Sequence, residues 1–418
     1  MKPKLLTTLE SYDRGQFLQD TIAGATVALV ALPLSIAIAI ASGAPPAAGL
    51  VTAVIGGLLI SALGGSRVQI GGPTGAFIVV VYTIIARHGL DGLMLATLMA
   101  GVLLVIGGIF RAGRLIRLIP EPVIEGFTIG IAVVIAASQL KDLAGLGGPA
   151  LPAEFVPKLE ALWAARATLD WPSLALGLAT IAGIVVIRRY APQFRARAAI
   201  VIVASAIAVF AVPSSETVAS RFGELPQGLP MPHLPPVSWP LIVELAPAAL
   251  TIALLAGIES LLSALVADRM IGGAHRTSAE LLAQGAANIA SPLFGGLPAT
   301  GAIARTATNV DAGGRTPVAG IVHAALILLA MVLLGPLAGA LALPALAGLL
   351  VITAWNMSEP HRWGERLAMP RWELALVALT AATTVLVDLT AAIGIGTLLG
   401  LAMQRWQRRR AAVPTSGD

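Results

Sequence analysis

The sequence predicts an all-α polytopic membrane protein with about fourteen transmembrane segments, arranged as two inverted repeats of seven. Composition is the first observation behind this prediction. Of the 418 residues, 57% are hydrophobic and only 12% are charged, and the mean hydropathy is +0.87. Soluble proteins carry about 25% charged residues. The other two observations are a pair of matching interruptions in the apolar sequence and the positions of the basic residues.

The transmembrane segments follow from the apolar runs, because a helix needs roughly 17–25 residues to cross a bilayer. Such runs lie near residues 20–41, 46–63, 91–110, 120–140, 172–190, 197–213, 242–268, 277–293, 316–335, 338–357, 371–388 and 389–406. Two shorter, broken segments after Pro73 and after Ala299 complete repeats of about 15–213 and 242–408. A short helix is expected between Pro152 and Arg166. Residues 1–418 are expected to form a single transmembrane transport domain.

The basic residues favour the gaps that follow even-numbered segments, as at Arg67, Arg269 and Arg315. By the positive-inside rule, this bias places both termini in the cytoplasm. Seven segments per repeat is an odd number, so the second repeat must be inverted relative to the first. Topology therefore explains the net charge of +5, which does not indicate a nucleic-acid partner. The first apolar run leads directly into more membrane sequence, and we interpret it as a span rather than a signal peptide.

The two interruptions have similar sequences, GGPTGA at residues 71–76 and GGLPATGA at residues 295–302. A helix that begins in mid-membrane leaves its first N–H groups unpaired and directs its positive dipole end at a ligand. Interrupted segments at matching places in two repeats are the best sequence indication of a transporter's binding site. The alternative is that both segments are merely kinked helices. We predict an anion site formed by Thr74, Gly75, Ala76, Thr300, Gly301 and Ala302.

Glu259 lies deep inside an apolar run, where an acidic residue is costly and indicates a functional site by default. It occupies the position in the second repeat that Pro33 occupies in the first. Ser263 lies one helical turn further on, on the same face. We predict that Glu259 and Ser263 form a coupling site for a proton or another cation. The alternative is a structural glutamate bonded to neighbouring backbone.

Arg305 follows the second interruption by about one helical turn, where its guanidinium would add fixed positive charge to an anion site. The alternatives are an ion pair with Glu259 or a side chain that reaches the membrane surface. Gln284 and Asn288 share one helix face, and they either support the pocket or join neighbouring helices. His323 stands alone in an apolar run and is expected to be a satisfied packing residue.

These residues lie in blocks that resemble the SulP family, the sulfate permease or solute carrier 26 anion transporters, over nearly the whole chain. The most specific block is SAELLAQGAANI at residues 278–289, followed by FGGLPATG at residues 294–301. The resemblance implies core and gate subdomains, in a uracil-transporter-like fold that nucleobase–cation symporters share. It also implies a substrate between the third and tenth segments, with Glu259 and Arg305 matching the family's acidic and basic residues there.

The chain departs from the family pattern at two places. After the first-segment proline the family usually has Gln and, soon after, Tyr, whereas this chain has Leu34 and Ile38. A substrate site that includes Pro33 and Leu34 would therefore be less polar and would suit an anion with a carbon skeleton. The family also carries a C-terminal STAS domain, which we expect this chain to lack.

We therefore expect a secondary active anion transporter of the bacterial inner membrane, which moves a dicarboxylate such as fumarate together with H⁺ by alternating access. The alternatives are a bicarbonate or sulfate transporter using Na⁺ symport or anion exchange, a nucleobase–cation symporter, and an anion channel. The expected partners are a small anion, H⁺ or Na⁺ and the lipid bilayer, with a homodimer as an option. The sequence contains no nucleophile–base set, cofactor motif or metal-ligand spacing, so an enzyme is not expected.

Overall fold

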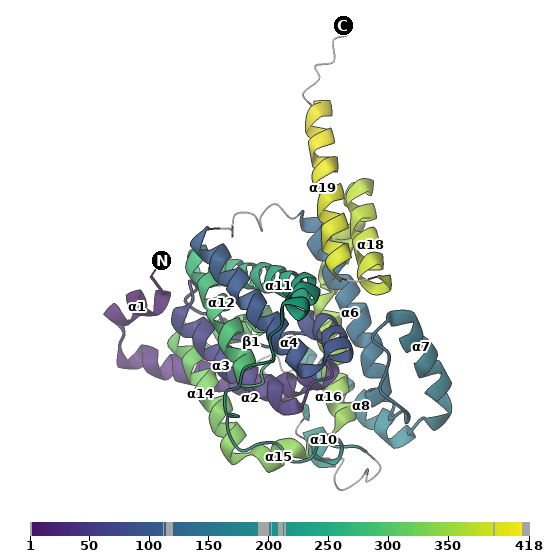
Figure 1. The fold of residues 1–418 in the computed structure, drawn as a ribbon. Helices are drawn as coiled ribbons and strands as arrows, with labels where there is room; N and C mark the ends of the chain where they lie inside the picture. The colour runs from purple at the N-terminus through teal and green to yellow at the C-terminus, as the bar shows by residue number, and fades with distance from the viewer. Residues whose placement is uncertain are drawn as a thin grey trace.

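The computed structural model describes residues 2–111, 113, 120–190, 200–201, 203–207, 212, 215–387 and 389–411, and most of them are helical (Figure 1). The first half comprises α1 (Lys4–Thr8), α2 (Arg14–Ala41), α3 (Pro46–Leu63), β1 (Gly71–Gly72), the 3₁₀ helix η2 (Gly75–Phe77), α4 (Ile78–Ile109), α6 (Glu121–Leu143), α7 (Phe155–Ala164), α8 (Trp171–Tyr190) and α10 (Val218–Phe222). The expected short helix between Pro152 and Arg166 is found as α7. The expected segment at 197–213 falls mostly outside the described residues.

The second half repeats the pattern of the first. It comprises α11 (Trp239–Ile271), α12 (Thr277–Leu293), β2 (Thr300–Gly301), α13 (Ile303–Asp311), α14 (Val318–Leu333), α15 (Gly335–Gly339), α16 (Leu343–Met357), α17 (Trp363–Leu367), α18 (Arg371–Leu386) and α19 (Leu389–Ala411). In each half a long helix and a second helix lead into a two-residue strand, which a new helix follows at once. α4 is bent at Gly89, whose φ of 66° is non-helical, so it contains both the broken segment and the next expected span.

The two strands pair with each other in antiparallel register, Gly71 opposite Gly301 and Gly72 opposite Thr300. The two interruptions are far apart in sequence, yet they lie side by side in the fold. The expectation that they meet is therefore confirmed. We call this pair of strands the crossing.

The helices form two packed bodies. In the first body, α4 packs on α11 and α12, α3 packs on α12 and α14, and α2 packs on α14. In the second body, α6 packs on α16 and α18, α8 packs on α16, and α19 packs on α18. Figure 1 shows α6, α8, α18 and α19 on one side of the molecule and α2, α3, α12 and α14 on the other. We call these bodies the core and the gate, and the crossing lies in the core.

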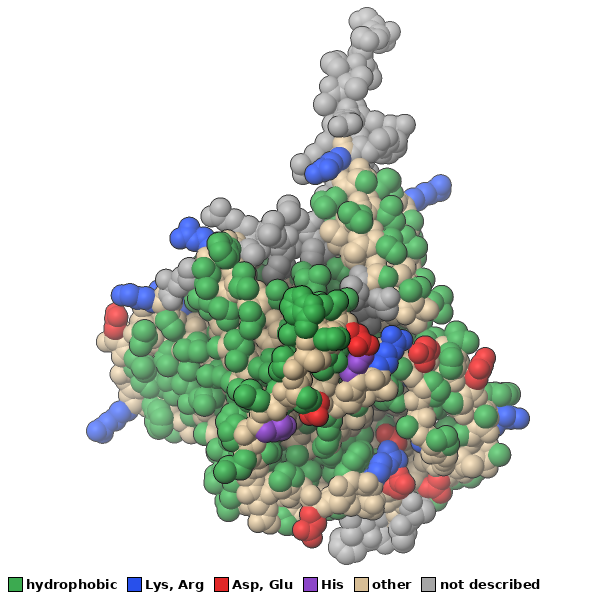
Figure 2. All heavy atoms as spheres, viewed as in Figure 1, with side chains coloured by type: hydrophobic (Ala, Val, Ile, Leu, Met, Phe, Trp, Pro, Cys, Tyr) green, Lys and Arg blue, Asp and Glu red, His purple; other side chains and the backbone are tan. Residues whose placement is uncertain are grey.

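Apolar side chains cover much of the outside as well as the interior. Figure 2 shows hydrophobic side chains over much of the visible face, with charged side chains at its margins and in a group across its lower centre. Leu29 of α2, Leu178 of α8 and Leu329 of α14 are each more than half exposed. Six described segments are long and apolar enough to cross a membrane: α2, α3, the run Gly75–Ile109, α6, α8 and α11. This surface suits a lipid environment better than water.

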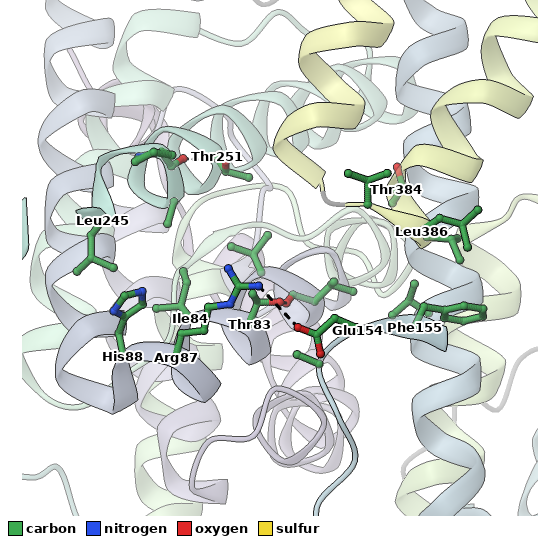
Figure 3. Close-up of a pocket in the computed structure, with 18 of the residues that line it drawn as sticks. Thr83, Ile84, Arg87, His88, Glu154, Phe155, Leu245, Thr251, Thr384 and Leu386 are labelled. Carbon is green, nitrogen blue, oxygen red and sulfur yellow. Dashed lines mark hydrogen bonds and ion pairs between the residues drawn. The ribbon is translucent and has the colours of Figure 1, made fainter. Parts of the chain in front are cut away.

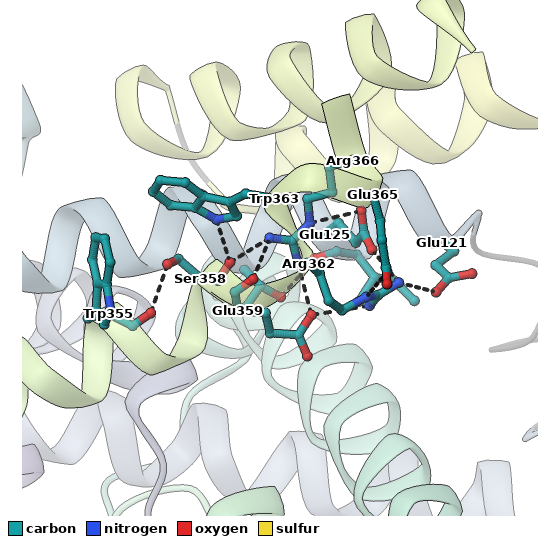
Figure 4. Close-up of polar contacts among 11 residues, drawn as sticks. Glu121, Glu125, Trp355, Ser358, Glu359, Arg362, Trp363, Glu365 and Arg366 are labelled. Atoms are coloured by element: carbon teal, nitrogen blue, oxygen red, sulfur yellow. Dashed lines mark hydrogen bonds and ion pairs between the residues drawn. The ribbon is translucent and has the colours of Figure 1, made fainter. Parts of the chain in front are cut away.

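An ionic network fastens the gate together (Figure 4). Glu125 of α6 is 5% exposed and lies 3.2 Å from Nε of Arg366 and 3.0 Å from Nη2 of Arg362. Arg366 also reaches Glu359 at 3.0 Å and donates to the main-chain oxygen of Ser358. The network therefore ties the start of α6 to the connection between α16 and α18.

Removing the buried arginine of this network is expected to destabilise the protein. Arg366→Gln should lower the free energy of unfolding by about 3 kcal/mol, because it leaves the buried Glu125 carboxylate short of a charged partner. The melting temperature of the purified protein in detergent would measure this. Arg362→Gln is the matched control. Its side chain is 31% exposed, so its effect should be clearly smaller. Equal losses for the two variants would contradict the assignment.

Candidate functional site

The crossing is fixed by main-chain and hydroxyl hydrogen bonds. Beyond the paired strands, the N–H of Ala302 donates to the carbonyl of Ile70 at 2.9 Å, and the N–H of Ile70 donates to Oγ1 of Thr306 at 3.1 Å. η2 begins directly after Thr74, and α13 begins directly after Ala302. The first N–H groups of two helical segments therefore emerge from one point of the fold, which gives that point a positive potential.

At two glycines of the crossing, the lack of a Cβ allows the side chain of another residue to pack closely against the backbone. Gly72 has a φ of 153°, and a Cβ added there would lie 1.9 Å from Nη1 of Arg305. A Cβ added to Gly301 would lie 1.4 Å from Nε2 of Gln69. At these two positions the space is occupied by the protein's own arginine and glutamine side chains.

Arg305 is buried beside the crossing, with 2% of its surface exposed. Its Nη2 donates to Oγ of Ser35 at 3.0 Å, next to Pro33 and Leu34 of α2. Within the described residues, its Nε and Nη1 have no hydrogen-bond partner. The guanidinium interacts electrostatically with Glu259, but its protein hydrogen bond goes to Ser35. Arg305 is buried, so the alternative in which its side chain reaches the membrane surface does not describe it.

Glu259 faces the crossing from α11. Its Oε2 accepts a hydrogen bond of 2.9 Å from the Thr74 hydroxyl, and its side chain is partly exposed. Ser263, one turn further along α11, lies 3.2 Å from the hydroxyl of Thr306 on α13. In the described part of the chain, Ser263 makes no hydrogen bond with Glu259. The structure thus joins Glu259 to the crossing, while Ser263 joins α11 to α13.

The remaining predicted site residues lie at the crossing in different ways. The Thr300 hydroxyl donates to the carbonyl of Ala256 at 3.0 Å, so it fastens β2 to α11. Gly75, Ala76 and Ala302 are buried around the two helix starts. Ile303, the first residue of α13, is 38% exposed although it begins a helix inside the fold. The start of α13 is therefore accessible from the surface.

Asn288 holds the interruption before β2 in shape. Its side chain donates to the carbonyl of Ala299 at 2.7 Å and accepts from the N–H of Ala299 at 2.9 Å. Gln284, one turn earlier, donates instead to Glu280 of its own helix at 2.9 Å. Of the two roles that the sequence left open, Asn288 has the supporting one.

Glu280 is a site-supporting residue that the sequence reasoning missed. It is fully buried, and it accepts hydrogen bonds from the N–H groups of Gly65 and Ser66 and from the Ser260 hydroxyl. Ser260 in turn bonds Gln69, the side chain that presses on Gly301. Glu280 therefore anchors the segment that leads into β1. Its place in the first turn of a helix resembles that of an ordinary exposed acid, so the sequence offered little signal.

The expectation for His323 was partly wrong. The side chain is fully buried in α14, as a packing residue would be. However, neither of its ring nitrogens has a hydrogen-bond partner within the described residues, so it is not satisfied.

Comparison with solved structures defines the class of protein. The transmembrane domain of a cyanobacterial bicarbonate transporter, BicA, superposes with a TM-score of 0.82 at 29% identity, covering 91% of this chain and 98% of that one. Murine solute carrier 26 family member A9, an anion transporter in the inward-facing state, superposes with a TM-score of 0.86. At 17% identity over 96% of this chain and 71% of that one, it shows the fold alone. The protein therefore has the transporter fold of two inverted repeats of seven segments, with core and gate subdomains.

The family follows from the sequence comparison. The model of the sulfate permease family matches residues 17–395, and the chain belongs to this family of anion transporters. The putative sulfate transporter YvdB of Bacillus subtilis is 41% identical over 391 residues, which cover 93% of this chain and 74% of the relative. The bicarbonate transporter BicA of Picosynechococcus is 30% identical, covering 90% and 68%. At the level of the family, these proteins are transporters and not enzymes.

Gly72→Ala is expected to disturb the crossing. The added methyl group would collide with the Arg305 guanidinium at a φ that side chains rarely adopt, so unfolding should become easier by about 1–3 kcal/mol. Thermal unfolding in detergent would measure the change. Gly394→Ala is the control, because a Cβ there meets nothing within 4 Å. A Gly72→Ala protein as stable as this control would contradict the described approach of Arg305 to β1.

Proposed function

We propose that the protein is a secondary transporter that carries a dianion together with H⁺ across the bacterial inner membrane by alternating access of the core relative to the gate. The proposal is carried by one observation, the placement of a carboxylate and a guanidinium at the same crossing of two helix starts. Both termini are proposed to lie in the cytoplasm, as the distribution of basic residues indicates.

The charge of the crossing decides which anions it suits. Each helix start contributes roughly half a positive charge, and Arg305 contributes a full one. With Glu259 ionised, the total is about one positive charge, which matches a monoanion. With Glu259 protonated, the total is about two, which matches a dianion. A dianion and a proton would therefore each favour binding of the other, which is the thermodynamic requirement for symport.

Two dianions deserve direct comparison, sulfate and a dicarboxylate such as fumarate. The name of the relative YvdB favours sulfate. Leu34 favours a dicarboxylate, because this half-buried apolar residue precedes Ser35, the partner of Arg305, and would contact a carbon skeleton. Ile38, the other apolar departure from the family pattern, is only 2% exposed, so it adds little to this argument.

Bicarbonate is the second candidate, because two of the relatives are named bicarbonate transporters. As a monoanion it would suit the crossing with Glu259 ionised, in Na⁺ symport or anion exchange. A nucleobase substrate would leave the buried charge of Arg305 without an anionic partner. An anion channel would be distinguished by its failure to concentrate substrate.

Uptake by the reconstituted protein tests the proposed function. Liposomes would be offered sulfate, fumarate, bicarbonate or uracil, with an inward proton gradient or without one. The expected result is concentrative uptake of a dianion that collapses when a protonophore removes the gradient. Uptake of bicarbonate driven by Na⁺ would replace this proposal with the second candidate, and purely downhill flux would indicate a channel.

Glu259→Gln is expected to separate binding from coupling. Glutamine resembles the protonated carboxyl group and keeps a partner for the Thr74 hydroxyl, so the variant should bind and exchange the dianion. It should lose accumulation driven by a proton gradient, because no proton can be released from it. Counterflow and gradient-driven uptake, measured on the same liposomes, would separate these two properties. If the variant still accumulates substrate, Glu259 has a structural role.

Arg305→Ala is expected to weaken the binding of every transported anion to a similar extent. A hydrogen bond to a charged group contributes about 1.5–3 kcal/mol, so dissociation constants should rise roughly 10- to 100-fold. Competition binding with each anion would measure the change, and Arg276→Ala would serve as the control. If the binding of only one anion were weakened, Arg305 would recognise the shape of the substrate and not only its charge.

A further inference from the structure

A short segment joins the core to the gate on the face of the molecule that carries α7. This segment, residues 151–158, includes the first turn of α7, and we call it the strap. α7 packs on α6 and α18, so the strap belongs to the gate. Its side chains nevertheless reach α4 of the core.

Three contacts hold the strap to α4. The Tyr82 hydroxyl donates a hydrogen bond to the carbonyl of Leu151. Nη2 of Arg87 lies 3.7 Å from Oε1 of Glu154, and both of these side chains are more than 60% exposed. Nζ of Lys158 lies 5.5 Å from the centre of the Tyr82 ring. The exposed ion pair between Arg87 and Glu154 contributes little to the stability of this attachment, because water screens it. The contacts of Tyr82 therefore contribute most of it.

Lys158 also binds the gate. Its Nζ donates a hydrogen bond of 2.8 Å to Oγ of Ser138 on α6, and the residue is 4% exposed. A buried ammonium group therefore lies between Tyr82 of the core and Ser138 of the gate.

The strap forms one wall of a cavity of about 440 Å³ at this boundary (Figure 3). Val80, Thr83 and Arg87 line it from the core, Val134 and Thr384 line it from the gate, and Glu154 lines it from the strap. A cavity between two bodies leaves space for one to move against the other, whereas a close-packed boundary would resist that motion.

We propose that Lys158 and Tyr82 form a latch that holds the core to the gate on this face and must open during each transport cycle. The latch rests on the proposed function, because only alternating access requires the core to move against the gate. When α4 moves, the contacts with Tyr82 and Arg87 break, while the contact with Ser138 stays within the gate.

The latch also responds to pH. Burial lowers the pKa of Lys158 to about 8, and the nearby Glu154 carboxylate opposes that shift. Below this pH the charged ammonium is attracted to the Tyr82 ring. Above it the neutral amine still donates to Ser138, but its attraction to the ring is lost. Arg87 faces Glu154 from α4. Alkaline conditions therefore weaken the contact between the strap and the core, while the bond from Lys158 to Ser138 of the gate remains.

Cysteine labelling tests the latch without any transported substrate. The chain contains no cysteine, so Val80→Cys introduces a single reporter at a cavity-lining position that is 7% exposed. The full chain would be placed in nanodiscs and treated with a membrane-impermeant maleimide at about pH 7. Adding Lys158→Met should raise the labelling rate roughly fivefold, the scale of a lost buried cation–π contact.

Two matched variants complete the test. Lys141→Met removes a lysine that bonds the carbonyls of Gly148 and Pro149, so it should leave the rate unchanged. Lys158→Arg retains the positive charge, so the reporter cysteine in this variant should be labelled nearly as slowly as in the parent.

Raising the pH to about 9 should reduce the difference in labelling rate between the parent and Lys158→Met. If the parent and Lys158→Met were labelled at the same rate at both pH values, the latch would be overturned. If the labelling rates change as expected but the liposome assay shows no dianion uptake coupled to H⁺, only the proposed function would be overturned.

Discussion

The antiparallel pairing of β1 with β2 is the constraint on which the rest of the structure depends. A helix interrupted inside a membrane exposes main-chain groups that lipid cannot satisfy, and such backbone survives only where protein surrounds it. Here each interruption provides partners for the other, from Gly71 opposite Gly301 to Gly72 opposite Thr300. The same pairing brings two helix starts together. The positive potential of the site is thus a by-product of the way in which the backbone is satisfied.

Two acids beside the crossing differ in how fully hydrogen bonds engage their carboxylates. Glu280 accepts bonds from two main-chain N–H groups and from Ser260 and Gln284, so its carboxylate is fully engaged. Among the described residues Glu259 accepts one bond, from Thr74, and its side chain is partly exposed. A proton can reach Glu259 without dismantling the fold, whereas protonating Glu280 would disturb the anchor of β1. The sequence pattern singled out Glu259 alone, although Glu280 is the more deeply buried of the two.

Much of the architecture was predictable from sequence because it depends on local patterns. Apolar runs located most of the helices, and the matching GGPTGA and GGLPATGA segments predicted the crossing. The partner of Arg305 was not predictable, since Ser35 lies 270 positions earlier and the contact depends on how α2 and α13 pack. The burial of Glu280 was missed for the same reason, as was the lack of a hydrogen-bond partner for the His323 ring among the described residues. Side-chain contacts between distant helices leave no periodic signal along the chain.

The crossing also sets an order of events during biosynthesis. β1 is made more than two hundred residues before β2, so the first half enters the bilayer before the partner strand exists. During that interval the main chain at Gly71 and Gly72 lacks the groups that later satisfy it, and insertion of a polar backbone into lipid is unfavourable. The first interruption must therefore stay hydrated or sheltered by the insertion machinery until α11, α12 and β2 arrive. Completion of the site is a late, long-range folding step, and a chain released before residue 301 would retain an unsatisfied break in its third segment.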